Sequence, residues 1–472
     1  MRKWILVLLA LVLPLAAINA QGMVASVTVQ DQFVNGDTVV IDSVYSPGPG
    51  FVVIHIDNGG SPGPVAGFAP VSAGMNGQVH INIDGSMATP MLFAMLHEDT
   101  GVVGEYEFGT VEGADSPVAV DGAVVTPSFN IQLVHGYDQF VMGDMVEIEH
   151  VITDAAGWLV IHSDNNGAPG PVLGQTMVEA GVNSEVMVEL AMDGRTTTLW
   201  PMLHVDTGEA GVYEFGTVEG ADSPVFVNGQ VVTFPIWTVP HMRVGNQATS
   251  GGDGMEMMDM DSVMVESVLS EGPGFVVIHI NNEGAPGPVA GFVAVPDGLS
   301  TDIAVPLSGD NAPTAVLFPM LHVDTGVVGE YEFGTVEGAD GPVAVDGNVV
   351  TFPINAAPSL TLREQSLTTN DAGVAVVIAE AVMDEPGWVV IHMDNEGAPG
   401  AVLGQTYLSM GVSRNVVVWI NDPSAVGTQV FPMLHYDTNE MGVYEFGTVE
   451  GADSPVFVDG AVIFAPLAIT AE

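Results

Sequence analysis

Eight of the twelve histidines fall into four pairs that recur along the chain. The first histidine of each pair ends a Val-Ile-His string, the second ends a Met-Leu-His string, and 42 or 43 residues separate them. If the two strings are neighbouring β-strands, residues two apart share a face, so two imidazoles and a thioether converge as a ligand set suited to copper. The copper candidates are His55, Met95 and His97; His162, Met202 and His204; His279, Met320 and His322; and His392, Met433 and His435.

The same histidines also fit a structural role. A histidine at the end of an apolar strand face packs half-buried and hydrogen-bonds a neighbouring carboxylate. For His97 this interpretation predicts Asp99, two residues further on, as the partner. The sequence leaves copper binding and structural packing open.

Carboxylates repeat in an equally strict register. Counted from the Met-Leu-His histidine, acids stand at +2, +10, +15 and +18 in all four copies. Oxygen ligands in glycine-rich turns suit calcium, but acidic side chains in turns also hydrogen-bond the local backbone without any metal. The calcium candidates are Asp99, Glu107, Glu112, Asp115, Asp206, Glu214, Glu219, Asp222, Asp324, Glu332, Glu337, Asp340, Asp437, Glu445, Glu450 and Asp453.

The third copy alone carries an acidic insertion at residues 251–264, and five of its residues are methionines. Thioethers bind Cu(I) without first losing a proton. The insertion therefore supports an alternative function, an extracellular copper-binding protein. A flexible acidic loop that is rich in methionine is the other interpretation.

The residues do not favour an enzyme. Ser116, which follows Asp115, is of a residue type that hydrolases use as a nucleophile. In the third copy Gly341 stands in its place, and glycine cannot be a nucleophile. The chain also lacks a nucleophile elbow, a P-loop, a dinucleotide fingerprint and a zinc-protease helix. We expect no catalytic residue, and calcium is the expected metal, with copper as the alternative.

These residues belong to a fourfold repeat. The string YEFGTVEGAD occurs unchanged at 106–115, 213–222, 331–340 and 444–453, with spacings of 107, 118 and 113 residues. Such spacings predict four small domains in tandem. Copies one and three (type A) share strings that copies two and four (type B) lack, so the array is A-B-A-B. The expected segments are a signal peptide at 1–20 and repeats at 24–130, 131–237, 238–355 and 356–472.

Each copy predicts an all-β domain. Short β-branched runs alternate with turn residues, and no segment shows a capped apolar period of 3.6 residues. About seven or eight strands per copy fit an antiparallel, immunoglobulin-like β-sandwich. Because the junctions near Ile131, Trp237 and Ala356 are short, we expect a semi-rigid rod.

The charge balance restricts the partners of the chain. There are 58 acidic and six basic residues, and two of the six lie in the expected signal peptide. Cleavage after Ala20 leaves four arginines, no lysine and a net charge of −54. Such a surface repels nucleic acid and anionic lipid and attracts cations. Because the segment 1–20 reads as a secretory leader and no second apolar run of about 18 residues follows, we expect an exported chain without a transmembrane anchor.

The ordered motifs of each copy carry a resemblance. An Asn-Gln, Asp-Gln or Glu-Gln pair is followed by G[FW]xVIHxxN, GxPGxVxG, MLHxDT and GxYEF with a GADxPV tail. This series resembles an extracellular β-sandwich domain of unknown function found in tandem in surface proteins of salt-adapted archaea and some bacteria. The resemblance implies a secreted or cell-surface location and a structural or adhesive role, with other surface proteins or glycans as partners.

Overall fold

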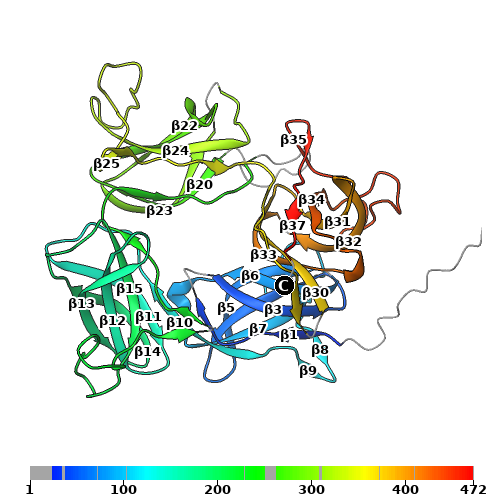
Figure 1. The fold of residues 1–472 in the computed structure, drawn as a ribbon, viewed down its shortest axis with the longest axis horizontal. Helices are drawn as coiled ribbons and strands as arrows, with labels where there is room; N and C mark the ends of the chain where they lie inside the picture. The colour runs from blue at the N-terminus through cyan, green and yellow to red at the C-terminus, as the bar shows by residue number, and fades with distance from the viewer. Residues whose placement is uncertain are drawn as a thin grey trace, which may run out of the picture.

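The computed structural model describes residues 24–34, 38–71, 73–102, 104–227, 229–249, 262–307, 311–370, 373–408 and 410–470. The expected signal peptide and residues 251–261 of the methionine-rich insertion lie outside the described residues. The four repeats are called domains 1 to 4 below (Figure 1).

Domain 1 is a sandwich of two antiparallel sheets. One sheet has the order β1-β3-β6, and the other contains β5-β4-β7-β10, with β2 added parallel to β10. This is the strand order of an immunoglobulin-like sandwich, and it confirms the predicted fold. The elements are β1 (Ser26–Thr28), β2 (Gln32–Val34), β3 (Thr38–Ser46), β4 (Gly50–Asp57), β5 (Pro62–Val71), β6 (Gly74–Asn82), the 3-10 turn η1 (Gly85–Met87), β7 (Met91–Glu98), β8 (Ala119–Val120), β9 (Ala123–Val124) and β10 (Ser128–His135).

Domains 2 to 4 repeat this arrangement. Domain 2 contains β11 (Met145–Thr153), β12 (Gly157–Asp164), β13 (Pro169–Val178), β14 (Gly181–Glu189), β15 (Thr198–Val205), β16 (Phe226–Val227), β17 (Gln230–Val231) and β18 (Ile236–Trp237). Domain 3 contains β19 (His241–Arg243), β20 (Ser262–Ser270), β21 (Gly274–Asn282), β22 (Ala285–Val295), β23 (Gly298–Pro306), β24 (Val316–Val323), β25 (Ala344–Val345), β26 (Asn348–Val349) and β27 (Ile354–Asn355). Domain 4 contains β28 (Ser359–Thr361), β29 (Thr368–Asn370), β30 (Gly373–Met383), β31 (Gly387–Asn395), β32 (Ala398–Leu408), β33 (Gly411–Trp419), η2 (Pro423–Ala425), β34 (Gln429–Tyr436), β35 (Phe457–Val458), β36 (Ala461–Val462) and β37 (Leu467–Ala468).

The central strand β4 is buried on both faces, which explains its unbroken apolar run. Val52 and Ile54 enter the main core between the sheets. Phe51, Val53 and His55 alternate with them, so they lie on the opposite face, yet they are buried too. The strand begins at Gly50, where a Cβ atom would collide with the backbone carbonyl of β7. A second buried layer therefore covers the outer face of this sheet.

The passage from domain 1 to domain 2 is a single strand. The first half of β10 pairs with β7 of domain 1, and its second half pairs with β11 of domain 2. β10 is thus the last strand of one sandwich and the first of the next. The junction has no free linker.

The array folds back on itself. A Cβ atom placed on Gly77 in β6 would lie 3.0 Å from the Cβ atom of Val417 in β33, which puts domain 4 against domain 1 (Figure 1). Domains 3 and 4 meet through Asn246, whose side chain donates a 2.6 Å hydrogen bond to Glu380, and Arg414 binds the same carboxylate at 3.0 Å. The array is therefore not the semi-rigid rod that the short junctions predicted, because domain 4 lies against domain 1.

Candidate functional site

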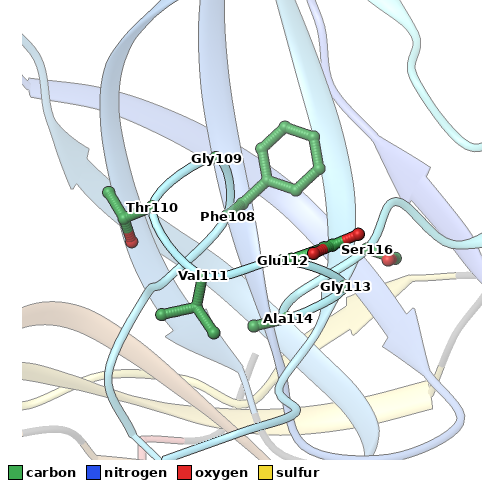
Figure 2. Close-up of a pocket in the computed structure, with 8 residues that line it drawn as sticks. All are labelled: Phe108, Gly109, Thr110, Val111, Glu112, Gly113, Ala114 and Ser116. Atoms are coloured by element: carbon green, nitrogen blue, oxygen red, sulfur yellow. The ribbon is translucent and has the colours of Figure 1, made fainter.

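The repeated loop, residues 99–116 in domain 1 and their equivalents in the other domains, forms the second buried layer. It leaves the end of β7 and folds over the outer face of the β4–β7 sheet. Tyr106 packs edge-on against Phe51, with ring centroids 5.3 Å apart, and Phe108 packs edge-on against His97 at 4.9 Å. The loop curls tightly enough that residues 108–114 and Ser116 line one open hollow (Figure 2). The loop therefore acts as a lid on the histidines.

The structure brings the predicted histidines together in all four domains. Their ring centroids are 6.0, 5.5, 5.7 and 5.8 Å apart in domains 1 to 4, and the ring planes differ by only 19–23°. In domain 1 Phe51 pairs with His97 and His55 pairs with Phe93, so the two imidazoles lean toward each other over the intervening residue pair. That intervening pair is Val53 and Met95. The copper candidates thus share one buried face.

Each imidazole is oriented by a backbone carbonyl. Nδ1 of His55 donates a 2.8 Å hydrogen bond to Gly63, and Nδ1 of His97 donates a 2.7 Å hydrogen bond to Asp115. The prediction that His97 bonds the Asp99 carboxylate is wrong, because Asp99 accepts a hydrogen bond from Gly104 N–H instead. Since a carbonyl can only accept, both Nδ1 atoms carry the proton, and a neutral ring then has a lone pair on Nε2.

Burial keeps the four Met-Leu-His histidines neutral. It lowers the pKa of His204 to about 4, although the hydrogen bond to the Asp222 carbonyl acts in the opposite direction, and neighbouring His162 lowers the pKa further. Burial likewise lowers the pKa of His435 to about 4 and the pKa of His97 and His322 below the usual value. At neutral pH these four imidazoles carry no charge.

Domain stability is expected to fall on mild acidification. Between the unfolded pKa near 6.5 and the folded value near 4, His204 binds a proton only when the chain unfolds, so lowering the pH favours unfolding. Replacing it in His204→Gln should flatten the slope of unfolding free energy against pH by about 1 kcal/mol per pH unit between pH 6.5 and 5. The measurement is denaturant unfolding in high salt, followed by tryptophan fluorescence. An unchanged slope would contradict the buried neutral state.

The aspartate at the end of the loop organises its backbone. The Asp115 carboxylate accepts hydrogen bonds from the N–H groups of Thr100 and Glu107, and its own N–H donates to the Thr100 hydroxyl. Asp115 is fully buried and has a φ of 47°, a left-handed conformation that Asp tolerates. The other domains repeat this arrangement at Asp222, Asp340 and Asp453.

The predicted calcium residues occupy different places in this loop. Glu107 accepts a hydrogen bond from Val102 N–H. Burial is the main cause that raises the pKa of Asp99, and the charges of nearby Asp115 and Glu107 raise it further. Glu112 is exposed on the outside of the loop. The equivalent exposed acids are Glu219, Glu337 and Glu450, and the equivalents of Asp99 and Glu107 are Asp206 and Glu214, Asp324 and Glu332, and Asp437 and Glu445. Within the described residues, no group of three or more His, Asp or Glu side chains is placed to hold a metal ion. Calcium binding stays a prediction.

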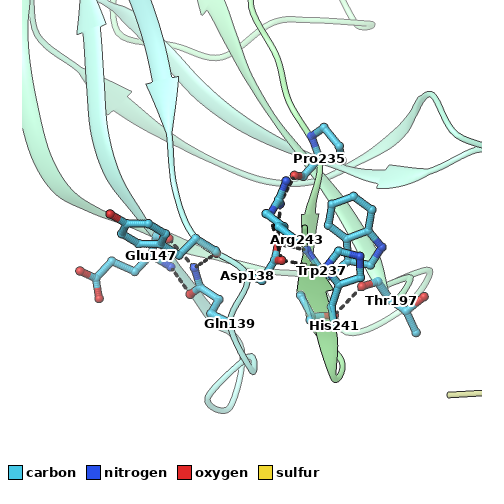
Figure 3. Close-up of polar contacts among 10 residues, drawn as sticks. Asp138, Gln139, Glu147, Thr197, Pro235, Trp237, His241 and Arg243 are labelled. Carbon is cyan, nitrogen blue, oxygen red and sulfur yellow. Dashed lines mark hydrogen bonds and ion pairs between the residues drawn. The ribbon is translucent and has the colours of Figure 1, made fainter. Parts of the chain in front are cut away.

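A clamp that the sequence did not reveal closes each sandwich. In domain 2, Gln139 exchanges two hydrogen bonds with the backbone of Glu147, and Asp138 accepts a hydrogen bond from the N–H of Trp237 at the domain's far end (Figure 3). The same glutamine bonds occur at Gln32, Gln247 and Gln365. The repeated Asn-Gln, Asp-Gln or Glu-Gln pair was visible as a landmark, but the partner of Asp138 lies about a hundred residues further along the chain.

Asp138 also joins domain 2 to domain 3. Its carboxylate binds Arg243 at 2.6 Å and His241 at 3.0 Å, and it is only 1% exposed (Figure 3). Trp237 stacks on His241 with centroids 4.0 Å apart, and the Arg243 guanidinium lies 4.7 Å from the same indole ring. Two of the five arginines, Arg243 and Arg414, therefore serve contacts at domain junctions.

Known proteins resemble parts of this chain. The chain is 35% identical over 109 residues to Cell surface glycoprotein 2 and 32% identical over 112 residues to Cell surface glycoprotein 1, both from Haloarcula hispanica. Each match covers 23% of this chain and only 11% or 12% of the relative. Among solved structures, the alpha-2-macroglobulins of E. coli and Salmonella match 93% of this chain and 29% of their own length, with 9% identity and TM-scores of 0.17 and 0.16.

Two further findings complete the comparison. Among the described residues, no helix is long and apolar enough to cross a membrane. One family matches most of the chain, at residues 25–132, 133–236, 253–356 and 358–470. The chain therefore belongs to the family described as Domain of unknown function (DUF7282) and carries four tandem copies of that domain.

Proposed function

We propose that this chain is a non-catalytic structural or adhesive component of an extracellular surface. The observation that carries the proposal is the way in which the domains are joined. β10 belongs to two sandwiches, Asp138 fastens domain 2 to domain 3, and β6 meets β33 of domain 4. Contacts of this kind build one shaped body from four copies, which suits a coat or stalk.

The matches to two cell surface glycoproteins support the same location. A leader-like segment at residues 1–20 and a net charge of −54 after its removal also fit a chain that works outside the cell, where cations are plentiful.

A test is to produce the full chain in a salt-adapted host and expose intact cells to protease. Surface placement predicts digestion without lysis, whereas protection until lysis would contradict it.

Cations are expected to stabilise the chain in two ways. Sodium chloride should raise the melting temperature because it screens repulsion among the acids. We propose that calcium adds to this effect at the loop, where Oδ1 of Asp99 and of Asp324 is buried without a hydrogen-bond partner. A bound ion at a hundredfold excess over Kd contributes about 2.7 kcal/mol.

The measurement is a thermal melt with millimolar calcium in saturating sodium chloride. The further rise should shrink in Asp99→Asn and persist in Glu112→Gln, a matched change at an exposed acid of the same loop. If calcium gives no rise once sodium has reached its full effect, these acids only organise turns.

A further inference from the structure

The paired histidines leave buried nitrogen atoms without partners. Nε2 of His55, His97, His279, His322, His392 and His435 is buried and makes no hydrogen bond. In domain 2 the Nε2 atoms of His162 and His204 face each other at 3.3 Å. Because both Nδ1 atoms donate to carbonyls, both of these Nε2 atoms are acceptors. Burying two acceptors that face each other without a hydrogen bond costs folding free energy, and the histidine pairs of the four domains share this arrangement.

The two lone pairs point along one line. In domain 2 the centroid separation of 5.5 Å exceeds the Nε2 separation of 3.3 Å by about twice the distance from an imidazole centre to its nitrogen. The two Nε2 atoms therefore lie nearly on the line that joins the ring centres. In the other domains the centroids are 5.7–6.0 Å apart, so the gap between the rings is slightly wider.

A cation on this line would satisfy both nitrogens. A shared proton needs a shorter gap, since hydrogen bonds from N–H groups span about 2.7–3.2 Å. Two metal–imidazole bonds in line, each about 2 Å as for zinc, need about 4 Å between the nitrogens. In domain 2 the 3.3 Å gap lies just beyond the hydrogen-bond range and about 0.7 Å short of the metal value. In domains 1, 3 and 4 the ring centroids lie further apart than in domain 2, so their gaps are nearer the metal value. A metal ion therefore fits these three pairs better than a shared proton, and the rings of domain 2 must move slightly apart to admit one.

The surroundings select a soft ion with few ligands. The walls are aromatic and aliphatic, namely Tyr106, Phe108 and Phe51 in domain 1. The carboxylate of Asp115 is already used by backbone N–H groups, so the hard oxygen ligands that calcium and magnesium require are not offered. Structural zinc takes four ligands. Cu(I) accepts two neutral nitrogens, and thioethers are among the ligands that suit it.

We propose that each histidine pair binds one Cu(I) ion in line between its two Nε2 atoms, four ions per chain, beside the methionine that shares the face. Neutral imidazoles offer their lone pairs at neutral pH without a proton to displace, which the burial of His97 and His204 ensures. The repeated loop covers each pair, and His97 and His204 are fully buried. This proposal is independent of the surface role above.

The test is anaerobic titration of the full mature chain with Cu(I) in competition with a chromophoric chelator. We expect four equivalents, and three in His204→Gln, whose amide still donates to the Asp222 carbonyl but offers no imidazole nitrogen. His150→Gln is the matched control, because His150 lies outside the pairs, and it should retain four. Deletion of residues 251–261, which hold four methionines, should also retain four.

X-ray absorption of the copper-loaded wild-type chain gives a readout that needs no variant. The proposal predicts two nitrogen neighbours at one short distance and the pre-edge feature of linear Cu(I). It is overturned if the chain binds no Cu(I), if His204→Gln still binds four, or if one equivalent bound only by sulfur disappears with residues 251–261. A proton shared between the Nε2 atoms in nitrogen NMR, together with no copper binding, would overturn it as well.

Discussion

Replacing Asp222 with alanine is expected to lower the unfolding free energy of domain 2 by about 3–5 kcal/mol. The change removes the acceptor for the N–H groups of Thr207 and Glu214, which both belong to the loop. Each unsatisfied buried group costs about 1–3 kcal/mol. Alanine must also hold a φ of 48°, which costs about 1–2 kcal/mol in the left-handed region. Partial relaxation of the loop keeps the total below the sum of these costs.

The measurement is chemical denaturation followed by tryptophan fluorescence. Trp158 packs on Tyr213 of the same loop at 5.4 Å, so it reports on the loop directly. Asp222→Asn should lose less, because asparagine tolerates the left-handed conformation and keeps one acceptor. Glu219→Gln is the exposed control and should change stability little. Equal losses in Asp222→Ala and Glu219→Gln would show that the aspartate does not organise the loop.

Replacing Asp138 with alanine should cost about 2–4 kcal/mol and loosen the contact between domains 2 and 3. The change leaves Arg243 and His241 without their carboxylate and the Trp237 N–H without an acceptor. The cost stays below that of a fully buried pair because Arg243 is 30% exposed and remains partly hydrated. Small-angle X-ray scattering should show a wider range of domain orientations, and protease should cut near residues 238–240.

Asp193→Ala, at an exposed turn of domain 2, is the control for both readouts.

The contribution of Asp138 to stability should also depend on pH. Burial alone would raise the pKa of Asp138, but hydrogen bonds from His241 and Arg243 and the arginine charge hold it below 3.8. Its stabilisation is therefore complete above pH 3.8 and is lost as the pH falls through the folded value. A junction that is equally rigid in Asp138→Ala would refute this role.

The sequence predicted the features that depend on short-range pattern. The unbroken apolar run at Phe51 to Ile56 and the turns around it indicate buried strands, and the unchanged ten-residue string reveals four domains. The strand alternation also placed His55 and His97 on one face. These conclusions need only strand periodicity and repetition.

The features that escaped prediction depend on contacts distant in sequence. Arg243 follows Asp138 by 105 residues in the sequence but lies beside it in space. Nothing in the sequence near Asp138 indicates this contact. The partner of His97 was misjudged because a carbonyl of Asp115, a group that every residue has, replaces the expected carboxylate. The return of domain 4 onto domain 1 depends on surfaces that form only after each sandwich has folded.

The shared strand β10 has a mechanical consequence. Tension on the chain passes from domain 1 to domain 2 along one continuous backbone, and the hydrogen bonds that hold β10 to β2, β7 and β11 run across its direction. A pull along the strand therefore loads many of these bonds in shear at the same moment, so they share the force and do not open one after another. Domains 1 and 2 should yield together as one load-bearing unit.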